Sequence, residues 1–201
     1  MALSSASKAG VAIFVGAVQF GIGLILAEIY YPGYNVSTNY VSDLGAYCPP
    51  SGPCVVNQPT SNIFNISIIL LGLLVIVGAY FLQSAYHWKP ASIMVAVAGI
   101  GALGVGLFPE TTGIWHGIFS LIVFLFSGLT ALVTARFQKK PMFYFSIILG
   151  LFTLLALFLY VGSEYLGLGA GGMERMVVYP VLLWSIGFGG HLMATEEKAM
   201  G

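Results

Sequence analysis

Charged residues are scarce in this sequence. Of its 201 residues only 7 are basic and 7 acidic. They make up 7% of the chain, whereas soluble domains average about 25%. Hydrophobic residues reach 58%, and a soluble globule of that composition could not cover its surface with polar groups. The net charge of zero gives no basis for a nucleic-acid partner, and we expect none.

Cysteine is almost absent, with two copies in the chain. Cys48 and Cys54 lie in the stretch CPPSGPC, whose prolines and glycine favour a compact turn. We predict a disulfide between them, which would place this segment in an oxidising compartment. Two free thiols or a metal pair are the alternatives. No histidine lies nearby, and the spacing differs from the Cys-x-x-Cys of a metal knuckle.

Long hydrophobic runs are what the chain has in abundance. A helix needs about 20 mostly apolar residues to cross a bilayer. Six such runs are present, at about residues 9–31, 63–82, 90–108, 113–135, 142–162 and 175–193. Because backbone amides in lipid must be satisfied within each segment, we predict an all-α integral membrane protein. The whole chain, 1–201, is expected to form one six-helix transmembrane domain.

The basic residues predict the orientation of these helices. With the N-terminus in the cytoplasm, the inner segments hold six basic residues (Lys8, Lys89, Arg136, Lys139, Lys140 and Lys198), and the outer segments hold one, Arg175. Such a bias is typical of cytoplasmic loops. We therefore expect both termini in the cytoplasm and the first loop, with its cysteines, outside the cell membrane.

Glycine-rich segments have two interpretations here. Gly167, Gly169 and Gly172 match the dinucleotide-binding spacing Gly-x-Gly-x-x-Gly, but that motif needs a βα unit, and here it joins two predicted membrane helices. We reject it and expect a flexible hairpin. In the run 90–108, small residues recur at every fourth position, at Ala98, Ala102 and Gly106. This stripe favours close helix packing in lipid.

Polar residues near the outer ends of the predicted helices are the candidate functional residues. Buried polar groups are costly in membranes and therefore commonly functional. The binding candidates are Glu28, Asp43, Glu110, His116, Glu164, Glu174 and Arg175, and the catalytic candidates are Ser42, Asp43, His116 and Glu174. Individual residues also have structural interpretations: Ser42 and Asp43 as a turn or cap, Glu174 as a helix start, and Arg175 as a partner of Glu28 or Asp43. Together they favour one shared pocket that opens outward.

Several chemistries are conceivable for that pocket. His116 with Asp43 could form a base and its orienter, with Ser42 or Ser163 as nucleophile, but such a triad can be assembled from many sequences. Whether the protein is an enzyme stays undecided. His116 is the only histidine on this side, so we expect no metal site. A haem would need two axial ligands at similar depth; His87 and His191 both lie towards the inner side, but His87 is expected in a loop, so we expect no cofactor.

The stretch NYVSDLG followed by FNISIILLGLLVIVGAYFL resembles the membrane family known as domain of unknown function 998. FPETTGIWHGIFSLIVFLFSGLTAL and GGMERMVVYPVLLWSIGFGGHLM are similar to later blocks of that family. The order of these motifs is also similar to a wider group that includes the damage-regulated autophagy modulators and a GPI-anchor remodelling factor related to the FRAG and SFK proteins. The resemblance implies a six-helix bundle, an archaeal plasma membrane and a role in lipid handling. The matching positions are Ser42, Asp43, Glu110, His116, Glu174 and Arg175.

Three functional hypotheses follow from the sequence. The leading one is a membrane protein whose outward pocket binds or modifies a lipid or a lipid-linked headgroup. The second is a non-enzymatic accessory or scaffolding subunit that contacts other membrane proteins through its small-residue stripe. The third is a small transporter that uses the carboxylates as a proton or cation site.

Overall fold

The computed structural model describes residues 2–194, and within that range it contains six long helices. They are α1 (Ser5–Tyr30), α2 (Thr60–Tyr86), α3 (Lys89–Leu107), α4 (Ile114–Thr134), α5 (Met142–Val161) and α6 (Gly169–Met193). Each is long and apolar enough to cross a membrane, which confirms the predicted six-helix architecture. Glu196, Glu197 and Lys198 lie outside the described residues.

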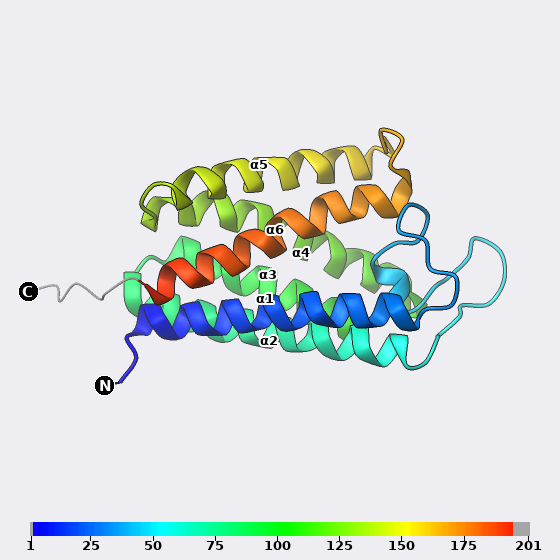
Figure 1. The fold of residues 1–201 in the computed structure, drawn as a ribbon, viewed down its shortest axis with the longest axis horizontal. Coiled ribbons are helices and arrows are strands. Elements are labelled where there is room, and N and C mark those ends of the chain that lie inside the picture. Colours follow the sequence, from blue (N-terminus) through cyan, green and yellow to red (C-terminus); the bar gives the residue numbers. More distant parts are fainter. Residues whose placement is uncertain (1, 195–201) are drawn as a thin grey trace, which may run out of the picture.

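The helices form a closed bundle. Each packs against the next in the sequence, and α6 packs back against α1 (Figure 1). α1 begins and α6 ends at the same end of the bundle, which we call the terminal end. The connections at residues 31–59 and 162–168 lie at the opposite end, which we call the loop end (Figure 1). An even number of crossings requires this arrangement.

Small residues set the closest approach between helices α2 and α3. A Cβ on Gly72 would lie 2.5 Å from the amide nitrogen of Leu103, and one on Gly106 would lie 2.8 Å from the carbonyl oxygen of Asn65. Ala98 and Ala102, the other members of the predicted stripe, are buried. In lipid no hydrophobic force drives helices together, so such close van der Waals contact supplies much of the energy of helix association.

A buried polar network ties α5 and α6 together near the terminal end. The indole Nε1 of Trp184 donates to Ser146 Oγ at 2.7 Å, and Ser146 Oγ donates to Gln138 Oε1 at 2.5 Å. Gln138 in turn donates to Thr134 on α4 at 3.4 Å. The network therefore fixes the relative rotation of three helices with groups that lipid could not satisfy.

Helix α6 begins earlier than the sequence analysis predicted. We expected a flexible glycine hairpin before a helix that starts at residue 175, but the helix begins at Gly169, so Gly169, Gly171 and Gly172 lie in its first turn. The carbonyl oxygen of Ser37, from the α1–α2 loop, accepts from the amides of Gly171 and Gly172 at 3.0 and 3.4 Å. A Cβ on Gly171 would collide with the backbone of Asn39. Glycine is thus needed because a distant loop lies directly on the helix and caps its free N–H groups.

Candidate functional site

The segment NYVSDLG, residues 39–45, closes the loop end of the bundle. It packs between the helices, where Val41 and Leu44 are buried in the apolar core. Its short 3₁₀ turn spans Ser42–Leu44, and Ser61 Oγ at the start of α2 donates to the Gly45 carbonyl at 2.5 Å. We call this segment the plug. It carries Ser42 and Asp43 to the depth of the helix ends.

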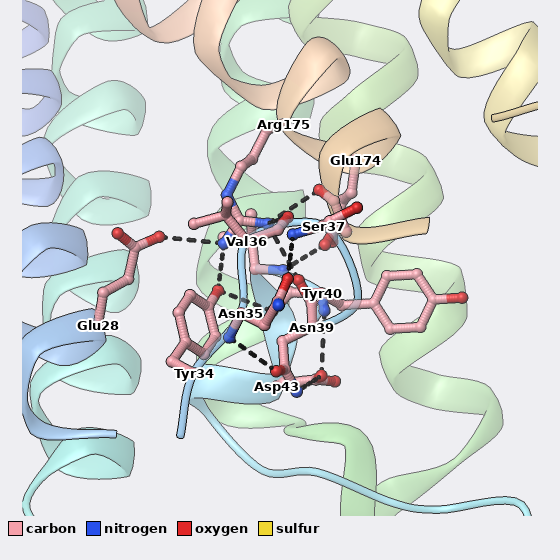
Figure 2. Close-up of polar contacts among 12 residues, drawn as sticks. Glu28, Tyr34, Asn35, Val36, Ser37, Asn39, Tyr40, Asp43, Glu174 and Arg175 are labelled. Carbon is pink, nitrogen blue, oxygen red and sulfur yellow. Dashed lines mark hydrogen bonds and ion pairs between the residues drawn. The ribbon is translucent and has the colours of Figure 1, made fainter. Parts of the chain in front are cut away.

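Arg175 fastens the plug to helices α1 and α6. Its guanidinium forms an ion pair with Glu28 at 3.0 Å and lies over the ring of Tyr34 at 5.3 Å from the centroid. It also donates to the Tyr34 hydroxyl and to the carbonyl oxygens of Val36, Asn39 and Gly171 at 2.9, 3.0 and 2.9 Å (Figure 2). Of the two partners considered for Arg175, the structure selects Glu28. The planar, multidentate guanidinium suits this role because it can satisfy several acceptors at once.

Asp43 is nearly enclosed, with 3% of its surface exposed. Its Oδ2 accepts from the Asn39 side chain at 2.9 Å and from the Tyr40 amide at 3.0 Å (Figure 2). Its Oδ1 is buried with no N–H or O–H donor among the described residues and lies beside the carboxyl of Glu110. Burial, reinforced by the neighbouring Glu110 charge, raises the pKa of Asp43 to about 6. A proton on Asp43 would satisfy both carboxyls.

Glu110 joins the plug to the α3–α4 connection. Ser42 Oγ donates to its Oε1 at 2.7 Å, and the Cys48 amide donates to its Oε2 at 3.3 Å. Burial raises the pKa of Glu110 as well. Cys48 and Cys54 form the predicted disulfide. The bridge therefore also restrains a backbone amide that contacts the site, a link that the sequence did not reveal.

The remaining two candidates at the bundle end, Glu174 and His116, face the same space from α6 and α4. Glu174 is 3% exposed, and its Oε2 accepts from the Val41 amide of the plug. His116 is 9% exposed, and its Nδ1 lies 2.8 Å from the Phe108 carbonyl oxygen. Because a carbonyl can only accept, Nδ1 carries a proton, and in the neutral imidazole Nε2 is then an acceptor.

These contacts correct the triad considered from the sequence. His116 is oriented by a backbone carbonyl rather than by Asp43, and Asp43 accepts its hydrogen bonds from Asn39 and Tyr40. Ser163 is exposed in the α5–α6 connection. Glu164 is exposed beside it, so the structure does not bring this candidate into the cluster. No group of three or more metal-ligating side chains occurs within residues 2–194.

A polar pocket of about 390 Å³ lies at the centre of this cluster. Its polar lining comes from five elements and consists of Tyr40, Ser42, Glu110, His116, Ser120, Tyr160 and Glu174. Sequence reasoning missed the two tyrosines, which are packed edge to face with centroids 6.1 Å apart. No sequence signal marks them, because aromatic residues near helix ends are also typical of the belt at a membrane interface.

The exposed residues that line the pocket belong to α4 and α5 and form its rim. This rim includes Leu121 and Val161, which are 50% and 68% exposed. Gly117, also on the rim, is exposed, and a Cβ there would meet no atom within 4 Å. We call this gap the lateral opening.

A second cavity continues the pocket into the bundle. It has a volume of about 110 Å³ and is mostly apolar, with walls from α1, α2, α3, α4 and α6. It extends from Glu174 to Trp184 and Phe188 near the terminal end. The two spaces share Ser42, Ser120, Phe124 and Glu174 as lining residues, so they adjoin at the plug. α5 contributes no wall to the inner cavity and instead borders the lateral opening.

Fold and site together define a multi-pass α-helical membrane protein with a polar pocket joined to an apolar cavity. The family described as protein of unknown function (DUF998) matches residues 14–191, which is most of the chain. The chain therefore belongs to the DUF998 family. Comparison with curated proteins and with solved structures gave no match.

Proposed function

We propose that this protein binds a membrane amphiphile, with the headgroup in the polar pocket and a hydrocarbon chain in the apolar cavity. The observation that carries the proposal is the junction of the two spaces at Ser42 and Glu174. Ligand sites in proteins are concave, mostly apolar and oriented by a few polar groups, and this arrangement fits that description. No reaction is assigned to the site.

The lateral opening supports access from the bilayer. Its apolar rim lies where lipid chains would contact the helices, so an amphiphile could enter without its chain crossing water. Hydroxyl groups of Ser120 and Ser127 lie along the way inward, on the same face of α4. The buried carboxyls and His116 at the loop end provide the polar contacts that a headgroup requires.

We further propose that the loop end faces outward from a plasma membrane and that both termini are cytoplasmic. The basic residues at the terminal end support this orientation: Lys8 lies 5.5 Å from the centroid of Phe81, and Arg136 lies 5.0 Å from that of Trp88. Cationic side chains with aromatic neighbours suit the cytoplasmic interface. The disulfide at the opposite end supports an oxidising compartment there.

Filling the lateral opening tests the proposal. Gly117→Leu places a side chain on the rim without a steric cost, because nothing lies within 4 Å of the added Cβ. Gly190→Leu is the matched control, since a Cβ at Gly190 near the terminal end also meets nothing. Both exchanges raise helix propensity, so folding should not suffer.

The assay is mass spectrometry of lipids that remain bound after purification in mild detergent. We expect the wild type and Gly190→Leu to retain a bound amphiphile and Gly117→Leu to lose most of it. Equal retention in all three proteins, or none in the wild type after reconstitution into native lipid, would refute the proposal.

A further inference from the structure

The electrostatic character of the polar pocket points to the chemistry of its ligand. The ionisable side chains that line it are Glu110, Glu174 and His116, and no lysine or arginine is among its lining residues. Arg175 is adjacent in sequence to Glu174 but is committed elsewhere, to Glu28, Tyr34 and backbone carbonyls. An anionic headgroup in this pocket would therefore meet two carboxyls with no cation to compensate it.

Unpartnered acceptors point into the same space. His116 is more than nine-tenths buried, and its Nε2 has no partner among the described residues. Glu174 is buried further, and only its Oε2 has a donor, the Val41 amide. Both side chains line the pocket, so these two acceptors are the positions where a ligand would donate hydrogen bonds. Glu110 adds a third acceptor, since each carboxylate oxygen can accept more than one hydrogen bond.

The tyrosines add a preference for a cation. Tyr40 and Tyr160 both line the pocket, and their rings are perpendicular to one another at 6.1 Å. Aromatic faces attract an ammonium group within about 6 Å, and the attraction strengthens when water is excluded. Carboxyls, a histidine lone pair and aromatic rings are together suited to a group that donates several hydrogen bonds and carries positive charge.

We infer that the polar pocket binds the protonated primary amine of a single-chain amphiphile. An ammonium group has three N–H donors, one for each of Glu110, Glu174 and His116. The hydrocarbon chain of the amphiphile would lie in the apolar cavity. This inference rests on the proposed function and adds the headgroup class. The amine donates to His116 Nε2 and brings a positive charge to the carboxyls, whereas an alcohol donates one hydrogen bond without charge and a phosphate adds negative charge.

Three probes of equal chain length test it: dodecylamine, dodecanol and dodecyl phosphate. An alkylamine is protonated at neutral pH, as a lysine side chain is. Binding to the detergent-purified protein is measured for each probe by competition with a fluorescent dodecyl amphiphile. We expect dodecylamine to bind about tenfold or more tightly than dodecanol, in line with the strength of charge-assisted hydrogen bonds, and dodecyl phosphate to bind most weakly.

Two variants locate the amine. Glu174→Gln keeps an acceptor for the Val41 amide, and Glu110→Gln keeps one for Ser42, so both should fold. Each is expected to weaken dodecylamine binding about tenfold and to leave dodecanol binding unchanged. Glu164→Gln, at an exposed carboxyl outside the pocket, is the matched control and should alter neither.

The outcomes separate this inference from the proposed function. If dodecyl phosphate binds as tightly as dodecylamine, or if Glu174→Gln and Glu110→Gln both leave amine binding intact, the amine assignment is wrong. If in that case dodecanol still binds and Gly117→Leu blocks it, the amphiphile site stands without its headgroup class. If none of the three probes binds, both proposals fail.

Discussion

Substitution of Asp43 by asparagine should stabilise the protein at neutral pH. Asp43 is 3% exposed, and burial raises its pKa from 3.8 to about 6. Between those two values the folded state binds more protons than the unfolded state. Stability therefore falls as pH rises from about 4 to 6 and is constant above that range, as far as this group is concerned. A shift of about two pKa units corresponds to about 3 kcal/mol.

The geometry explains why the amide should be tolerated. An asparagine carbonyl can accept from Asn39 and the Tyr40 amide, as Oδ2 does now. Its NH₂ group can donate from the position of Oδ1, which lacks a donor in the wild type and lies beside Glu110. Asp43→Asn thus resembles the protonated acid at every pH, and it removes an uncompensated buried charge at pH 7.

The assay is the free energy of unfolding in detergent between pH 4 and pH 7. The wild type should lose about 3 kcal/mol over this range, and Asp43→Asn should lose much less. Glu110, whose pKa is raised by burial too, contributes with the same sign, so Asp43→Asn combined with Glu110→Gln should flatten the profile further. Glu164→Gln serves as the exposed control. A wild type that gains stability on going from pH 4 to pH 7, or an Asp43→Asn protein less stable than the wild type at pH 7, would refute the reasoning.

Three further changes are predicted from the contacts of single groups, each checked by unfolding in detergent. Arg175→Met leaves Glu28 and several carbonyls without their donor and should lower the free energy of unfolding by about 3 kcal/mol, partly recovered by adding Glu28→Gln. A loss below about 1 kcal/mol would contradict the role of Arg175 in fastening the plug. Replacing both Cys48 and Cys54 by serine opens a short loop and should cost about 2 kcal/mol, an effect that reduction of the wild type should reproduce. Trp184→Phe removes the donor to Ser146 and should cost about 2 kcal/mol, and an unchanged unfolding midpoint would remove that network from the packing argument.

The polar residues that the sequence predicted at one end of the bundle lie together there. Asp43, Glu110, His116 and Glu174 were expected at one end of the bundle, and all four lie there, in or beside the polar pocket. Their positions along the chain were sufficient to predict this, because connections between successive membrane helices alternate between the two ends of the bundle. Glu164 satisfied the same criterion but is exposed, since position along the chain does not tell which way a residue at a helix end faces.

The sequence by itself determined the class of the protein, its six helices and its disulfide. The length of an apolar run is a local property, and a run long enough to match the bilayer thickness is expected to form a membrane helix. Two cysteines separated by a short turn have few other partners for a disulfide. These features require no knowledge of which helix packs against which.

Only the tertiary structure decided the start of α6, the partner of Arg175 and the shape of the site. Each depends on the α1–α2 loop, a segment far away in the sequence that caps α6 through Ser37 and supplies carbonyls to Arg175. The junction between the polar pocket and the apolar cavity likewise arises from five helices that pack around one space. Such contacts are fixed by the fit of distant surfaces, which no local pattern of residues encodes.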